Sequence, residues 1–216
     1  NGDGIVGYYE LMTMDNYWLD ETCGCPDLCG GADLDINGRI DLYDFAILAA
    51  NWLTSNSAVF YAEYLDSDPG WTVEGEWAFG VPSGGGGVSY GNADPTGGAT
   101  GIDVYGVNLS GDYSVAALPS YRWVTTPAID CSGRYGVELR FKRWLNVDVQ
   151  SRVVAIVDVY DGSHWYNYVW YNESVPVTDS GWVDCTYDIS QWADNNPDLR
   201  IRWGNWDRSG ALPYSG

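Results

Sequence analysis

Oxygen-bearing residues between positions 33 and 44 recur at a spacing that suits a hard metal ion. The ligand positions are Asp33, Asp35, Asn37, Asp41 and Asp44, which offer side-chain oxygens, and Arg39, which offers its backbone carbonyl. Calcium takes about 6–8 oxygen ligands at about 2.3–2.6 Å, and alternating residues of a tight loop supply them. Gly38 permits the sharp turn that brings the Arg39 carbonyl round to the ion. The spacing therefore predicts a Ca²⁺ site.

An amphipathic helix is predicted directly after this loop, since it must hold the loop's last ligand in place. Apolar residues recur there at helical spacing and predict one apolar face. They are Leu42, Phe45, Ala46, Ala49, Trp52 and Leu53. Ile40, inside the loop, is expected to face the core.

A second copy of the loop and helix becomes visible when the chain is slid by 34 residues. Asn1, Asp3, Gly4, Val6, Glu10, Leu11, Trp18 and Leu19 then overlay Asp35, Asn37, Gly38, Ile40, Asp44, Phe45, Trp52 and Leu53. The ligands of this copy are Asn1, Asp3, Glu10 and the backbone carbonyl of Ile5. Its first ligand position is missing, and Gly7 offers no side chain. This second site is either weak or completed by residues outside the chain.

The duplicated unit resembles the type I dockerin family. That family's pattern, D-x-[DN]-x-[DN]-G-x-[IV]-[DN]-x-x-D, is met by residues 33–44, and the resemblance covers about the first 54 residues. It implies an EF-hand-like, calcium-binding α-helical unit with a cohesin as partner. Cohesin-binding dockerins present small Ser-Thr-like pairs where this chain has Tyr8-Tyr9 and Leu42-Tyr43. Calcium is therefore expected mainly to fold this unit, because two short helices have too little core without a staple.

Composition limits the remaining possibilities. The chain has 216 residues, of which 45% are hydrophobic and 15% aromatic, enough for one good-sized core and a small second unit. A net charge of −20 disfavours binding to nucleic acid or anionic lipid. No apolar run is long enough for a membrane span. Cations, glycans and other proteins remain as partners.

Five cysteines favour an exported protein in an oxidising compartment, and we expect an extracellular or bacterial cell-surface location. A zinc site is disfavoured because the single histidine, His164, is far along the chain from the cluster of three cysteines. We expect Cys131 to pair with Cys185, and Cys29 to pair with Cys23 or Cys25. One thiol is then left over, either free or paired between chains.

After a linker at residues 55–58, the pattern changes to short segments of alternating polarity. The predicted strands are Val59–Leu65, Trp77–Gly80, Val104–Leu109, Tyr121–Thr126, Val137–Leu145, Val153–Tyr160, Trp165–Tyr171, Trp182–Ile189 and Leu199–Trp206. A short helical turn is expected near Gln191–Ala193, and Asp161-Gly162 marks a tight hairpin. The fold class is therefore mainly β: an antiparallel jelly-roll sandwich at 59–216 behind the helical unit at 1–54.

This second region is similar to the MAM-like and cleaved-adhesin-like jelly rolls of secreted bacterial proteins. The resemblance rests on segments such as DSDPGWTVEGEWAFGVPSGGGG, VYGVNLSGDY and LRFKRWL, and covers about Val59 to the end. It implies a structural calcium at Asp66 and Asp68, helped by a closing strand of the form WNIDDV that would follow Gly216. Both ends of the chain thus look cut, through clipping or because neighbouring copies complete one another by strand addition.

Catalytic motifs are not evident. There is no GxSxG or HExxH pattern, and His164 on a hairpin flank is expected to be packed or solvated. The Gly84–Gly87 run is expected to be a flexible or tightly turning loop. A sugar-stacking platform could use Trp144, Trp165, Trp170 and Trp206. Asn108 and Asn172 fit the N-x-[ST] glycan acceptor pattern.

From these features we expect a non-enzymatic, calcium-stabilised extracellular subunit with a structural or adhesive role. Copies of it are expected to assemble into a surface fibre or polymer. The alternative is a carbohydrate-binding or anchoring module of a secreted multidomain hydrolase. A dockerin–cohesin attachment is the third possibility.

Overall fold

A computed structural model describes residues 8–19, 32–34, 37–50 and 59–215. The chain divides into two compact units, Asn1–Phe60 and Tyr61–Gly216, called here the helical unit and the β unit. Each is described by itself. The linker expected at 55–58 lies outside the described residues.

The helical unit contains α1 (Tyr8–Asn16) and α3 (Leu42–Ala50). Both bounds of α3 lie 34 residues after those of α1, as the overlay of the two copies predicts. A small core of Met14, Ala32, Ile40 and Leu48 joins the two helices, with Leu11 packed against it. Ile40 is fully buried, as expected, and its carbonyl accepts a hydrogen bond from the Leu19 N–H at 3.0 Å.

The apolar face predicted for the second helix is wrong. Leu42 and Phe45 are 71% and 42% exposed, whereas Asp44 and Leu48 are buried. The physical reason is that the Asp44 carboxylate bonds to backbone N–H groups of the loop, which turns this side of α3 inward. Leu48 lies one turn further along the same side and follows it. The remaining apolar side chains of α3 are left at the surface.

The β unit is mainly β, and all of its paired strands are antiparallel. The strands are β1 (Thr72–Val73), β2 (Trp77–Gly80), β3 (Val104–Val107), β4 (Arg122–Thr125), β5 (Glu138–Arg143), β6 (Asn146–Val147), β7 (Val153–Tyr160), β8 (Trp165–Tyr171), β9 (Val177–Thr178), β10 (Val183–Asp188) and β11 (Arg200–Asp207). A short helix, α4 (Ser190–Ala193), follows β10 where a helical turn was expected.

Most of the predicted strands are confirmed within two residues at each end. The prediction of a strand at Val59–Leu65 is wrong, because these residues pair with no strand and most are exposed. The two-residue strands β1, β6 and β9 were missed, since so short a segment shows no alternation. The hairpin at Asp161-Gly162 is confirmed: the Asp161 N–H donates to the His164 carbonyl at 3.1 Å between β7 and β8.

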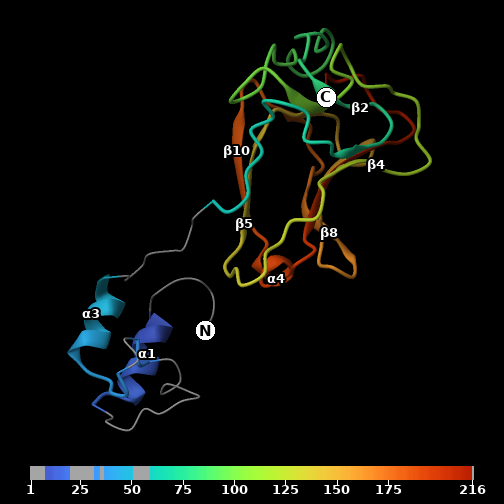
Figure 1. The fold of residues 1–216 in the computed structure, drawn as a ribbon. Coiled ribbons are helices and arrows are strands. Elements are labelled where there is room, and N and C mark those ends of the chain that lie inside the picture. Colours follow the sequence, from blue (N-terminus) through green and yellow to red (C-terminus); the bar gives the residue numbers. More distant parts are fainter. Residues whose placement is uncertain (1–7, 20–31, 35–36, 51–58, 216) are drawn as a thin grey trace. The chain divides into compact units, whose positions relative to one another are not determined.

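The strands form two facing layers, consistent with a β-sandwich (Figure 1). One layer is a five-stranded sheet in the order β1-β4-β11-β7-β8, and the β10-β5 pair lies opposite it. Val157, Val159 and Ile201 of the large sheet form a core against which Leu139, Phe141 and Tyr187 of the smaller pair are packed. The edge of the Phe141 ring meets Trp203 at 5.5 Å between ring centroids. Apolar burial between the two layers is the main stabilising contribution.

Arginine and tryptophan side chains cover the outer face of the large sheet. Arg202 on β11 lies between the rings of Trp123 and Trp165, with its guanidinium carbon 3.8 Å from each ring centroid. Beneath it, Asp158 of β7 is fully buried and accepts hydrogen bonds from Arg202 Nη2 at 2.6 Å and Nε at 3.1 Å. Gly204 leaves room for the Trp123 ring to lie flat, because a Cβ there would collide with it. The buried charge on this face is thus paired and capped by aromatic rings.

Candidate metal centre

The first ligand position of the predicted calcium loop is buried and already organised by the backbone. Asp33 is 2% exposed. Its Oδ1 accepts the N–H of Asn37 at 3.1 Å, and its Oδ2 accepts the N–H of Gly38 at 2.8 Å. Gly38 has a φ of 87°, the left-handed conformation that the turn requires. The loop therefore wraps around the Asp33 carboxylate, as the spacing predicts.

The last ligand position closes the loop onto its beginning. Asp44 is fully buried on α3. Its Oδ1 accepts the N–H of Leu34 at 2.7 Å, and its Oδ2 accepts the N–H of Asp41 at 2.9 Å. Asp41 in turn accepts the N–H of Tyr43 at 2.8 Å, so the two acids cap the first turn of α3 reciprocally. The residues at positions 1, 9 and 12 are thereby brought into one compact loop.

The donor set of this loop fits a hard cation. The first 60 residues contain a single basic residue, Arg39, while Asp33 and Asp44 are both buried carboxylates. A buried carboxylate needs a compensating charge. Each of their oxygens accepts one printed backbone N–H and retains a further lone pair for an ion. Asp35, the position 3 ligand, lies outside the described residues, and no group of three or more His, Cys, Asp or Glu gathers at a metal site among those described.

The incomplete loop contributes little to the described structure. Asn1, Asp3 and Ile5 lie outside the described residues. Glu10 lies on α1, at the position that corresponds to Asp44 on α3, but its side chain is also outside the description. The prediction of a second ion in the helical unit stays a prediction.

The calcium site predicted at Asp66 and Asp68 is only partly assembled. Asp68 Oδ1 accepts the hydroxyl of Tyr105 at 2.7 Å and the N–H of Gly70 at 2.8 Å. These hydrogen bonds hold the pKa of Asp68 below its usual value. Both acids are exposed in the segment before β1. The Asp68 carboxylate thus serves to attach this segment to β3.

Comparison with known proteins gives one partial likeness. The chain is 26% identical to Bacillopeptidase F of Bacillus subtilis (strain 168) over 169 residues, which make up 75% of this chain and 10% of that protein. The chain therefore spans about a tenth of the length of this relative. No protein-family model matches, and no solved structure matches. In the described part of the chain, no helix has the length and apolar character that a membrane span requires.

The cysteine prediction needs correction. Cys131 and Cys185 are both buried free thiols, so the expected bridge between them is not formed. Cys131 is fully buried in the apolar core between Ile129 and Val137, whereas Cys185 lies on β10 opposite Phe141 of β5. Burial, with the nearby negative charge of Asp130, raises the pKa of the Cys131 thiol to about 11. It behaves as a small apolar side chain. Cys23, Cys25 and Cys29 lie outside the described residues.

The two glycan acceptor sites differ in their surroundings. Asn172 is 1% exposed, and its Nδ2 donates to the carbonyls of Asp148 and Val153, each at 2.9 Å. A glycan on Asn172 is therefore incompatible with the folded β unit. Asn108, in a left-handed conformation with φ 47°, donates from Nδ2 to the Asp112 carbonyl. Its amide stabilises the turn after β3.

The four tryptophans considered as a sugar platform do not form one surface. Trp165 is part of the outer-face stack with Arg202. Trp170 packs against the core and lies under Arg143, whose guanidinium carbon is 5.0 Å from its ring centroid. Trp144 meets Trp182 edge to face at 5.7 Å. Trp206 stacks with Arg208 at 4.3 Å. Periodicity could not reveal these separate environments.

Sequence reasoning missed a pair of neighbouring acids around the glycine run. Gly84, Gly86 and Gly87 all have φ near 70°, which confirms a tightly turning loop. The N–H of Gly87 donates to Asp112 Oδ1 at 2.8 Å. Burial raises the pKa of Asp94 to about 7, the Ser215 hydroxyl partly opposes this, and the charge of Asp112 adds to it.

We expect the Asp94→Asn variant to weaken the pH dependence of stability. A carboxyl whose pKa is raised on folding contributes its full stability below 3.8 and loses it as the pH rises through about 7. The free energy of unfolding of the wild type should thus fall over this interval. In the variant this fall should be smaller by about 1–2 kcal/mol, after allowance for the partial exposure of the group.

Urea unfolding followed by tryptophan fluorescence at several pH values measures this difference. Asp130→Asn is the control, because hydrogen bonds from Ser132 lower the pKa of Asp130 and its contribution has the opposite sign. Identical pH profiles for wild type and Asp94→Asn would contradict the prediction.

Proposed function

We propose that this chain is a non-enzymatic, calcium-stabilised extracellular subunit with a structural or adhesive role, which associates with copies of itself. In this proposal the helical unit is dockerin-like and the β unit is a jelly roll. Calcium held by Asp33, Asp35, Asn37, Asp41, Asp44 and the Arg39 carbonyl folds the helical unit. The metal supplies the positive charge that the buried loop carboxylates need, and no reaction is assigned to it.

The observation that carries the proposal is the apolar outer side of α3. Leu42 is 71% exposed, Tyr43 is 73% exposed and Phe45 is 42% exposed, directly beside the loop that presents them. So many large apolar side chains on a nine-residue helix favour an interaction surface. Because Asp44 fixes which side of α3 faces inward, calcium in the loop and presentation of this surface are linked in the proposal.

Sedimentation velocity of the full chain over a range of concentrations, with calcium or with chelator, tests this proposal. We expect association in calcium and its loss in chelator. Leu42→Glu should abolish association, whereas the control Val88→Glu, at a β-unit residue that is 92% exposed, should not. Monomers at every concentration in calcium would rule out self-association.

The second candidate is a carbohydrate-binding or anchoring module of a secreted multidomain hydrolase. It is favoured by the likeness to a tenth of Bacillopeptidase F, since a short region shared with a much longer protein is typical of a module. A glycan array and a cohesin pull-down distinguish this candidate, because a self-associating subunit needs neither ligand.

A further inference from the structure

A buried carboxylate at the end of β11 has incomplete hydrogen bonding. Asp207 is 2% exposed, and among the described residues its Oδ1 has no hydrogen-bond partner. Its Oδ2 accepts only a 3.3 Å hydrogen bond from Asn205 Nδ2. The Oδ1 of Asn205 is likewise buried without a partner in the described structure. An unsatisfied buried oxygen costs about 1–3 kcal/mol, more when it is charged, so two at one place require an explanation.

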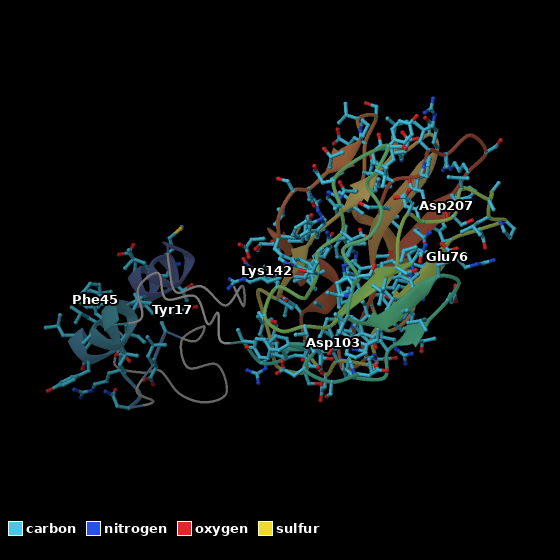
Figure 2. The ribbon with its side chains drawn as sticks, turned by 90° about the horizontal axis from the view of Figure 1, so that it is seen from above. Tyr17, Phe45, Glu76, Asp103, Lys142 and Asp207 are labelled. Atoms are coloured by element: carbon cyan, nitrogen blue, oxygen red, sulfur yellow. The ribbon has the colours of Figure 1, made fainter. Side chains whose placement is uncertain are left out.

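A second carboxylate lies beside this pair. The main cause that raises the pKa of Asp207 to about 6 is burial, and the next is the negative charge of Glu76. Figure 2 shows both acids on the same side of the β unit. Glu76 is exposed, and its Oε2 accepts the N–H of Ser114 at 3.0 Å. The Asp207 carbonyl accepts the N–H of Leu118 at 2.8 Å, so the segment 114–118 borders the same place.

Positive side chains near these acids are engaged elsewhere. Within the described structure, no lysine or arginine forms an ion pair with Glu76 or Asp207. Arg122, the cross-strand neighbour of Asn205, donates to the Tyr121 carbonyl at 3.5 Å. The guanidinium of Arg208 lies over the Trp206 ring at 4.3 Å. The two carboxylates therefore repel each other without compensation from the chain.

We propose that Asp207, Asn205 and Glu76 form a calcium site in the β unit. The three side chains offer only oxygen donors, which suit a hard cation and disfavour zinc. The unpartnered Asp207 Oδ1 and Asn205 Oδ1 are the buried ligands, and Glu76 is the ligand at the solvent side. Backbone carbonyls and water complete the coordination. This site is separate from the loop at 33–44 and does not depend on its function.

The thermal unfolding of the β unit in the full chain tests the site, with Ca²⁺ as the added metal. Ten of the twelve tryptophans lie after residue 60, so tryptophan fluorescence reports mainly on this unit. Asp207→Asn keeps the shape of the side chain and removes its charge. In chelator this variant should melt higher than wild type, because the repulsion from Glu76 is relieved. In calcium it should melt lower, because only the wild type gains stability from the ion.

Two further variants make the test decisive. Glu76→Gln, at an exposed position that cannot impair folding through the core, should weaken calcium binding to the β unit at least tenfold. Asp68→Asn, a control at an exposed acid of the same unit, should leave the calcium shift unchanged. The proposal is overturned if calcium does not raise the melting temperature of the wild-type β unit. It is also overturned if Asp207→Asn changes that temperature equally in calcium and in chelator.

Discussion

Arg202→Ala should lower the free energy of unfolding of the β unit by about 3–5 kcal/mol, the range for removal of one partner from a buried ion pair. Asp158 is fully buried, and Arg202 donates two hydrogen bonds to its Oδ2. Burial raises the pKa of Asp158, and the Arg202 guanidinium opposes that rise. Without the arginine, the carboxylate stays buried with only the Val159 N–H as a printed partner at 3.1 Å.

The loss of packing adds to the loss of charge pairing. The Arg202 guanidinium fills the space between Trp123 and Trp165, at 3.8 Å from both ring centroids. Alanine leaves a gap between two rings and admits water to the sheet face. Part of the effect is therefore due to lost contact area.

Denaturant unfolding followed by tryptophan fluorescence measures this prediction. The matched control is Arg200→Ala, two residues away on the same strand, whose partner Asp198 is 40% exposed. Such a surface pair contributes at most about 1 kcal/mol. Replacing both members, as Asp158→Leu with Arg202→Met, should recover most of the stability, since no charge is then left buried. Equal effects of Arg200→Ala and Arg202→Ala would contradict the assignment of a buried pair.

Asp44→Asn should weaken calcium binding to the helical unit by about 100-fold or more, because it removes one charge from the loop's closing ligand. At a calcium concentration 1,000 times the wild-type dissociation constant, bound metal contributes about 4 kcal/mol, and most of this is lost in the variant. The core that joins the helices has only four buried residues, so the unit should unfold without the ion. Chelator should unfold it in the wild type.

Far-ultraviolet circular dichroism and calcium titration calorimetry of the full chain measure these effects. The matched control is Asp15→Asn, since Asp15 is an exposed acid on α1 outside the loop. It should retain both affinity and helix content. If chelator leaves the helical signal of the wild type unchanged, the calcium argument fails for this unit.

Local chemistry made much of the fold readable from the sequence. The alternation in Val153–Tyr160 and Trp165–Tyr171, with Asp161-Gly162 between them, predicts both strands and their hairpin at the observed bounds. The 34-residue repeat likewise predicts where α1 and α3 begin and end. These features depend on residues close together in the chain, so their signal is local.

Tertiary structure decided which side chains face inward. Helical spacing gave α3 an apolar face through Leu42 and Phe45, but the loop bonds of Asp44 turn the opposite side inward. The sequon at Asn172 became a buried amide because three backbone groups of neighbouring segments require it. Such roles depend on partners distant in sequence, which no local pattern reports.

The sequence by itself determined the loop that begins at Asp33, the repeat and the succession of strands, because turn geometry and side-chain alternation are local properties. Only the tertiary structure brought Glu76 next to Asp207, and Arg202 between Trp123 and Trp165. Each of these groups joins strands or loops that are far apart in the chain. Whether a charge is paired, buried or left uncompensated depends on that packing, and so do the binding and stability effects expected here.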